Sequence, residues 1–193
     1  MADRSTKSAL EFRPLTSERW PELEKLFGPN GACGGCWCMW WRLTAAQFQE
    51  HKGPGNRDAL KRIVESGEVP GIIAYSQGEP VGWCSVAPRQ AYPRLERSRT
   101  LKRVDDKPVW SVVCFFVAKP WRRKGVTEAL LKAAQEYAAR YGARLVEAYP
   151  VEPGGKAIPD AFAYTGLAST FRRAGFDEVL RRSPTRPIMR KSL

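Results

Sequence analysis

An almost wholly apolar run, VWSVVCFFV, occupies residues 109 to 117. A strand of this composition needs cover on both faces, so it belongs near the middle of a sheet. A basic turn, KPWRRKG, follows it and leads into a helix in which alanine and leucine recur at helical spacing. Gly142 ends that helix, and residues 144 to 149 return as a strand. This βαβ-like unit predicts an α/β fold.

The rest of the chain alternates between short strands and helices, and its length suits one domain. Residues 88 to 108 are arginine-rich and aperiodic, which is typical of a partly mobile surface loop. Thr44 and Gln47 match a capping box. The patterning predicts a strand at 9–13, helices at 16–27, 45–51 and about 56–66, a hairpin of 71–76 with 81–87, and a late strand at 177–181.

Lys and Arg outnumber Asp and Glu by 32 to 20. This excess indicates an anionic partner: a nucleic acid, an acidic membrane face, or the phosphate groups of a small ligand. No apolar run is long enough to cross a membrane, and residues 1 to 12 lack the apolar segment of a secretory signal. We therefore expect a cytoplasmic protein without a membrane partner. The cysteines number five, an odd count that favours reduced thiols over a disulfide framework.

The basic turn before the long helix is the best candidate for binding an anion. The first turn of a helix carries free backbone N–H groups and the positive end of the helix dipole. Arg122, Arg123 and Lys124 are unfavourable beside that positive end unless an anion is also present. Gly125 lets the backbone approach a diphosphate without a Cβ in the way. The alternative is an ordinary solvated helix start.

Residues 117 to 127 resemble the acyl-CoA-binding signature of the GNAT superfamily of N-acyltransferases: Arg or Gln, two residues, Gly, any residue, then Gly or Ala. Arg122 and Gly125 match, and Thr127 stands where the last small residue is expected. Residues 169 to 176, STFRRAGF, resemble the late helix of that family, which ends in Gly-Phe. With the hairpin and the early helices, the resemblance covers nearly the whole chain.

The resemblance implies an α/β (α+β) fold in one domain over residues 1–193, with a central mixed, mainly antiparallel sheet flanked by helices. It also implies direct transfer of an acetyl group from acetyl-CoA to an amine, and we expect a small-molecule acceptor. In that case the basic turn holds the pyrophosphate of coenzyme A. The expected cofactor-binding residues are Phe116, Val117, Arg122, Arg123, Lys124, Gly125, Val126 and Thr127.

The catalytic residues are less well marked. In the resembled family a tyrosine four residues before the late Gly-Phe often supplies a proton, and a carboxylate on the central strand often acts as base. Here Phe171 occupies the first place and the central strand has no acid. Tyr164 and Glu147 are the candidate substitutes, with packing and a surface strand position as their alternatives. Backbone groups where two strands diverge could also orient the thioester without a side chain.

The aromatic run after the first helix is a candidate acceptor site. Its members are Trp37, Trp40, Trp41 and Arg42. Aromatic walls with one charged group suit a small molecule that has an apolar or cationic part. The alternative is that Trp37 and Trp40 cap the core while Arg42 is exposed.

Three cysteines and the single histidine allow other readings. Cys33, Cys36, Cys38 and His51 could bind zinc, and Cys33 with Cys36 could form a redox couple. Their spacing matches no standard ligand pattern, so we favour a packed turn and expect no metal.

Two other functional classes remain open. The absent acid and base leave room for a catalytically silent regulatory protein that binds acyl-CoA. The charge and the basic residues 181 to 187 leave room for a nucleic-acid-binding module, but no signature of such a module accompanies them. The sequence also leaves a homodimer open.

Overall fold

The computed structural model describes residues 9–155 and 158–193. The strands of this described part form one sheet in the order β1-β2-β3-β4-β5-β7-β6. The elements are β1 (Leu10–Pro14), α1 (Trp20–Phe27), α2 (Ala45–Glu50), α3 (Pro54–Glu65), β2 (Gly71–Ser76), β3 (Glu79–Pro88), α4 (Pro93–Glu96), β4 (Trp110–Val117), α5 (Val126–Arg140), β5 (Leu145–Ala148), α6 (Ala168–Arg173), β6 (Asp177–Arg181) and β7 (Pro187–Ser192).

The sheet is mixed and mainly antiparallel. Only β4 and β5 run parallel, and the other neighbouring pairs are antiparallel. The predicted fold class is therefore confirmed, and the apolar run at 109 to 117 forms the central strand β4.

In the part of the chain that the structure describes, no helix combines the length and apolar character needed to cross a membrane.

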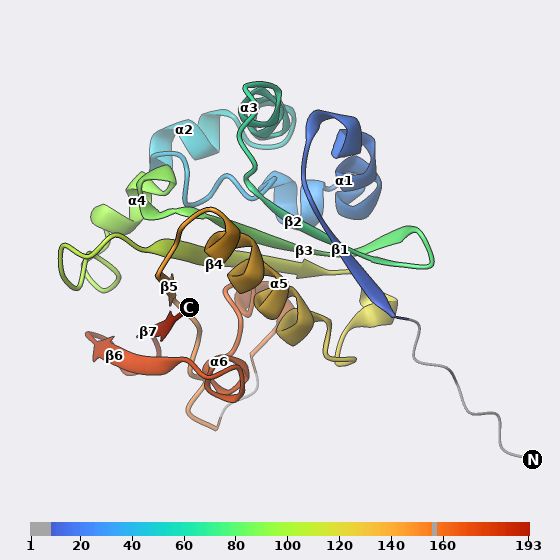
Figure 1. Ribbon diagram of the computed structural model, residues 1–193. Helices are drawn as coiled ribbons and strands as arrows, with labels where there is room; N and C mark the ends of the chain where they lie inside the picture. The colour runs from blue at the N-terminus through green and yellow to red at the C-terminus, as the bar shows by residue number, and fades with distance from the viewer. Residues whose placement is uncertain (1–8, 156–157) are drawn as a thin grey trace, which may run out of the picture.

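Helices cover both faces of the sheet (Figure 1): α1 to α4 lie on one face, and α5 and α6 lie on the other. Successive strand residues alternate between the two layers, so Ile73 packs beneath the early helices while Ile72 packs against α5. Gly82 lets α5 approach the sheet closely. A Cβ at Gly82 would lie 3.0 Å from side-chain atoms of Leu130 and Val126.

A β-bulge interrupts β4. Ser85 pairs with Cys114 but Val86 pairs with Val112, so Val113 is an extra residue on β4. Val113 and Cys114 consequently both contribute to the core beneath the early helices. The bulge lies near the middle of the central strand, whose later half leads to the basic turn.

The segment at 88 to 108 differs from its prediction as a partly mobile surface loop. It contains a short turn at Arg89–Ala91 and then α4, and Tyr92, Leu95 and Leu101 are buried in the core. Ala91 and Val104 pack beside these three side chains, but the spacing of the five is irregular, so the sequence gave little sign of this packing.

The basic residues from Arg181 onward make contacts within the fold. Arg181 pairs with Glu178 and Glu152, and Arg182 donates to three backbone carbonyl oxygens of the 100–103 segment. The chain then continues into β7, a mostly buried strand that lies between β5 and β6. These cations are therefore engaged within the protein.

Candidate active site

The basic turn connects β4 to α5 through a short turn at Lys119–Trp121. Gly125 is the N-terminal cap of α5 and has φ +81° and ψ 1°, a left-handed conformation that favours glycine. Arg123 and Lys124 are exposed beside it. The Arg122 side chain folds back, and its Nε donates to the Val117 carbonyl oxygen at 3.1 Å. The turn thus presents two exposed cations and a glycine at the start of a fifteen-residue helix.

The first turn of α5 offers backbone donors to an anion. The Ala129 amide donates to the Gly125 carbonyl oxygen at 3.1 Å, which is the first helical hydrogen bond of α5. The amides of Val126, Thr127 and Glu128 precede it and have no acceptor within the helix. Together with the positive end of the helix dipole, these amides make the turn suited to a diphosphate.

A groove starts at Gly125 and follows α5 toward α6. Its volume is about 730 Å³. Cationic side chains line it from three elements, since Lys132 comes from α5, Arg173 from α6 and Lys191 from β7. Glu128 and Glu136 also line it, so the groove continues from the turn along the helix with side chains of both charges.

The strands β4 and β5 diverge next to this turn. Their pairing covers only Trp110 to Val112 on β4, and β4 then continues to Val117 without β5. The chain before α6 enters the gap, where the Phe115 amide donates to the Tyr164 carbonyl oxygen at 2.6 Å. Ala118 donates to Val81 at 3.0 Å. Because backbone groups alternate in direction, the Val117 amide points away from β3 and toward the divergent side.

Tyr164 lies at the divergence. Its side chain is partly buried against the core beneath the early helices. Burial raises the pKa of Tyr164 to about 12, against the opposing positive charge of Arg186. The hydroxyl is therefore protonated at neutral pH and can donate a hydrogen bond. Phe171, at the place of the usual proton donor, is fully buried and packs on Phe115 and Phe176.

Glu147 is neither exposed nor free. It is fully buried, and one carboxylate oxygen accepts from Arg89 Nη1 at 2.7 Å and from the Tyr149 hydroxyl at 2.5 Å. The other oxygen accepts from Arg190 Nε at 2.7 Å. Arg190 also pairs with Asp105. These contacts correct the picture of a surface strand residue, and they favour a structural role for Glu147 over that of a base.

The predicted acceptor wall does not form one surface. Trp37 and Trp41 are core residues, and Trp37 stacks on Trp20 with ring centres 6.0 Å apart. Gly31 permits this packing, because a Cβ there would lie 2.2 Å from the Trp37 ring nitrogen. Trp40 is 38% exposed. Of the three tryptophans in this run, Trp37 and Trp41 have their rings buried in the core, and only Trp40 presents part of its ring to solvent.

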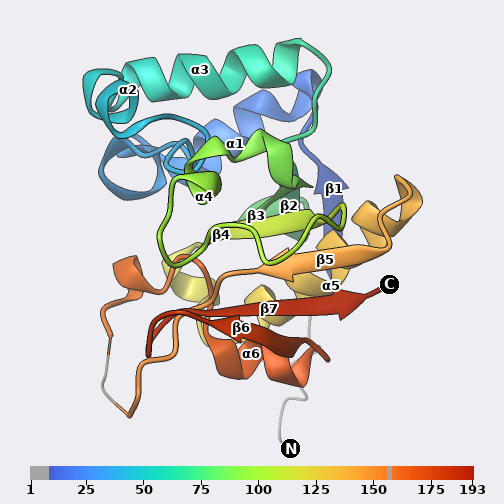
Figure 2. The same ribbon diagram turned by 90° about the vertical axis from the view of Figure 1, so that its left-hand side faces the viewer.

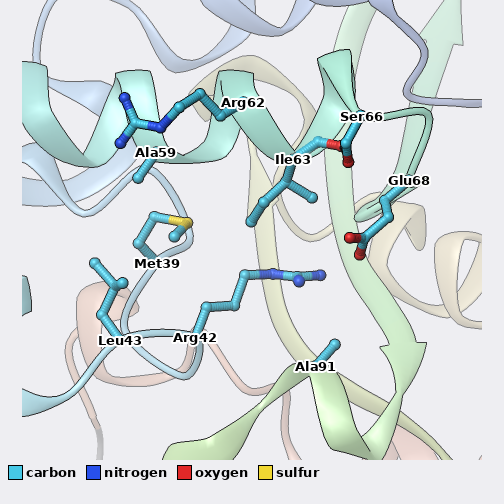
Figure 3. A pocket seen from close by; sticks show the side chains of 9 residues that line it. All are labelled: Met39, Arg42, Leu43, Ala59, Arg62, Ile63, Ser66, Glu68 and Ala91. Carbon is cyan, nitrogen blue, oxygen red and sulfur yellow. The ribbon is translucent and has the colours of Figure 1, made fainter.

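Arg42 lines a separate hollow of about 450 Å³ between α3 and the 39–43 segment. Figure 3 shows Arg42 and Glu68 pointing into this hollow. The guanidinium carbon of Arg42 lies 4.7 Å from the centre of the Tyr92 ring. Helix α3 and Tyr92 both belong to the layer opposite α5, so this hollow is not part of the basic turn.

Residues 37–159 match the model of the Acetyltransferase (GNAT) family. The chain belongs to the GNAT family. Solved structures agree in fold. The PaiA N-acetyltransferase of Thermoplasma acidophilum, in complex with coenzyme A, has a TM-score of 0.54 and 13% identity over 96% of this chain and 99% of its own.

Two further GNAT-fold structures are similar. The aminoglycoside N-acetyltransferase AAC(6')-Iy, in complex with CoA, has a TM-score of 0.57 and 17% identity over 93% of this chain and 95% of its own. A GNAT-family acetyltransferase of Listeria monocytogenes has a TM-score of 0.59 and 10% identity over 95% of each chain. At these identities the likeness is one of fold. No curated protein sequence matches this chain.

The cysteine loop of this GNAT protein packs against the core. Cys33 is exposed and Cys36 half-buried, while the buried Cys38 thiol accepts from the Trp83 ring nitrogen at 3.0 Å. Burial raises the pKa of Cys36 to about 11, which makes its thiol a poor nucleophile. Among the described residues, no three His, Cys, Asp or Glu side chains are grouped so as to hold a metal ion.

Two arginines without a carboxylate partner among the described residues were not singled out from the sequence. Arg94 is at the start of α4, and Arg186 lies in the turn between β6 and β7. Arg94 stood in the stretch interpreted as a surface loop, and Arg186 stood in the basic stretch 181 to 187. Their only sequence signal was the overall excess of positive charge.

Proposed function

We propose that this protein transfers the acetyl group of acetyl-CoA to the amine of a small molecule, as one domain over residues 1–193 and in the cytoplasm. The observation that carries the proposal is the strand, basic turn and helix at β4 and α5. The amides of Val126, Thr127 and Glu128, with Arg123 and Lys124, bind the pyrophosphate. The groove along α5 accommodates the nucleotide part of the cofactor.

The reaction in this proposal is direct attack. The neutral amine nitrogen forms a bond to the thioester carbonyl carbon, and the carbon–sulfur bond breaks. The amine loses one proton and the departing sulfur gains one, so no net proton is released. The Val117 amide orients the cofactor, and the Tyr164 hydroxyl donates a hydrogen bond to the sulfur. We assign no side-chain base, since both oxygens of Glu147 are engaged.

A catalytically silent protein that binds acyl-CoA is the second candidate. Phe171 favours it, because the usual donor position is filled by a buried ring. The two candidates share cofactor binding and differ in turnover. Release of free thiol from acetyl-CoA in the presence of an amine panel separates them. A nucleic-acid-binding role is not favoured, because Arg181 and Arg182 are engaged within the chain.

Gly125→Asp should weaken coenzyme A binding by at least about tenfold, since it places a carboxylate against the diphosphate and costs one charged contact. Gly142→Asp is the matched control. Gly142 has φ +80°, close to the +81° of Gly125, and a Cβ at either position meets no atom within 4 Å. Both variants carry the same backbone strain, but Gly142 lies at the far end of α5.

Calorimetric titration with coenzyme A measures the affinities, and the melting temperature without ligand checks that each variant is folded. Equal affinities in folded Gly125→Asp and Gly142→Asp would remove the proposed binding site. Gly125→Asn should be intermediate, because it keeps the strain and the side-chain volume but lacks the charge.

The pH profile should rise with deprotonation of the acceptor amine and then stay level to about pH 10. The pKa of Tyr164 is about 12, so its hydroxyl keeps its proton over this range. The measurement is kcat/KM for the acceptor at saturating acetyl-CoA. A descending limb between pH 7 and 9 would show that the group donating to the sulfur has a lower pKa than Tyr164.

A further inference from the structure

A tight turn between α1 and α2 has a cysteine at each end. Its residues are Cys33, Gly34, Gly35 and Cys36, and the Cys36 amide donates to the Cys33 carbonyl oxygen at 3.1 Å. Gly34 has φ +55° and Gly35 has φ +73°, as the two central residues of a type I′ β-turn require. Figure 2 shows the segment that joins α1 to α2 at the edge of the molecule, next to α2.

This turn brings the two cysteines within the range of a disulfide bond. A β-turn holds its first and last Cα atoms less than about 7 Å apart. A disulfide joins residues whose Cα atoms are about 4.4 to 6.8 Å apart. The turn is also held from outside, because the Gly35 carbonyl oxygen accepts from the Gly53 amide at 3.0 Å and from Asn56 Nδ2 at 3.1 Å. The Cys33–Cys36 couple that the sequence left open is therefore compatible with the backbone of the folded chain.

The cysteines differ in their access to solvent. Cys33 is exposed and Cys36 is half-buried, whereas Cys38, Cys84 and Cys114 are buried. Burial raises the pKa of Cys36 to about 11 and raises that of Cys84 well above its ordinary value. The thiolate is the form that reacts with an oxidant, and only an accessible sulfur meets one. Cys33 is therefore the first cysteine that a dissolved oxidant can attack.

Cys36 has a second cysteine nearby in the sequence, Cys38, but that thiol is already engaged. The buried Cys38 sulfur accepts from the Trp83 ring nitrogen at 3.0 Å. A bond between Cys36 and Cys38 would draw the sulfur away from this donor and leave a buried N–H group without an acceptor. The arrangement thus favours Cys33 as the partner of Cys36.

We propose that Cys33 and Cys36 form a reversible disulfide when the protein meets a peroxide. The Cys33 thiolate attacks one oxygen of hydrogen peroxide, and the oxygen–oxygen bond breaks to give a sulfenic acid and hydroxide, which takes up the proton that the thiol had lost. The Cys36 sulfur then attacks the Cys33 sulfur and loses its proton, and the sulfur–oxygen bond breaks to release water. Two thiols and one peroxide thus give one disulfide and two waters.

The second step is within one molecule. Cys36 is a poor nucleophile in solution because of its raised pKa, but the turn holds it beside the sulfur that it attacks. Such positioning acts as a high effective concentration. A small dithiol such as dithiothreitol supplies the two electrons that restore both thiols, so the modification is reversible.

The test counts thiols in the full chain. Reduced protein, freed of reductant, is treated with hydrogen peroxide and then unfolded in an alkylating reagent that labels every remaining thiol. The count should fall from five to three, because two of the five sulfurs join, and dithiothreitol should restore it. The tryptic peptide of residues 26–42 contains Cys33, Cys36 and Cys38, and only Cys38 should be labelled.

Three variants assign the steps. Cys36→Ser should stop at the sulfenic acid of Cys33, which dimedone traps, and Cys33→Ser should keep all of its remaining thiols. Cys38→Ser is the control, since its hydroxyl can still accept from the Trp83 ring, and it should form the disulfide as the parent does. The melting temperature of each reduced variant checks that it is folded.

The parent chain decides the proposal even where a variant fails to fold. Five thiols that survive a peroxide dose sufficient to oxidise free glutathione would overturn it. So would a bond from Cys36 to Cys38, or oxidation of Cys33 that leaves the Cys36 thiol free. The experiment uses neither coenzyme A nor an amine, so its failure leaves the proposed acetyl transfer untouched.

Discussion

Glu147→Gln should lower the free energy of unfolding by about 3 kcal/mol, because removing one partner from a buried ion network leaves uncompensated charge. Arg89 is only 4% exposed and would keep Glu96 as its remaining carboxylate, and Arg190 would keep Asp105. Because those two ion pairs remain, we expect the loss of stability to fall at the lower end of the roughly 3 to 5 kcal/mol that breaking a buried ion pair costs. The network joins β5, β7 and the 89–105 segment, so its loss should loosen all three together.

Urea denaturation measures this change through the transition midpoint at an unchanged slope. Glu178→Gln is the control, since Glu178 is exposed and pairs with Arg181 and Arg172; it should cost under about 1 kcal/mol. If Glu147→Gln were as stable as that control but much slower in turnover, the carboxylate would act in catalysis and the structural assignment would be wrong.

Local patterns predicted most of the fold. The central strand, the hairpin, the basic turn and α5 follow from runs of neighbouring residues, and the Thr44–Gln47 capping box is present as expected. Such signals depend on residues a few positions apart. The confirmed parts of the prediction are therefore those that are determined by residues close together in the sequence.

The environment of Glu147 depends on distant residues instead. Its partners Arg89 and Arg190 are 58 and 43 positions away. Arg190 lies on β7, whose mixture of apolar and charged residues gave no clear strand pattern. The inward turn of Trp37 likewise depends on the absence of a side chain at Gly31. No periodicity in the sequence reports such long-range pairing, so neither the ion pairs of Glu147 nor the burial of Trp37 could be predicted from it.

The candidate proton donor was chosen by its position before α6, and its mode of action follows from its chemistry. The pKa of Tyr164 is about 12, and an ordinary thiol has a pKa of about 8.5. Complete transfer of the phenolic proton to a thiolate is thus unfavourable by roughly three to four pKa units. Tyr164 can still stabilise the departing sulfur by donating a hydrogen bond while keeping its proton.

Tyr164→Phe should therefore lower kcat by roughly 10²-fold, the typical effect of removing one donor to a developing anion. Coenzyme A affinity should change little, because the contact forms only as the sulfur leaves. Single-turnover rates at saturating acetyl-CoA, with calorimetry for the affinity, measure the two quantities. Tyr141→Phe is the control: Tyr141 is 64% exposed at the end of α5 and loses the same hydroxyl.

A kcat in Tyr164→Phe within a few-fold of the Tyr141→Phe value would assign the rate to positioning alone. An ordinary thiol has a pKa of about 8.5, which is close to physiological pH. The thiolate can therefore depart without a side-chain donor when the amine is held at the carbonyl carbon. In that case the Val117 amide and the divergence of β4 from β5 would supply the orientation.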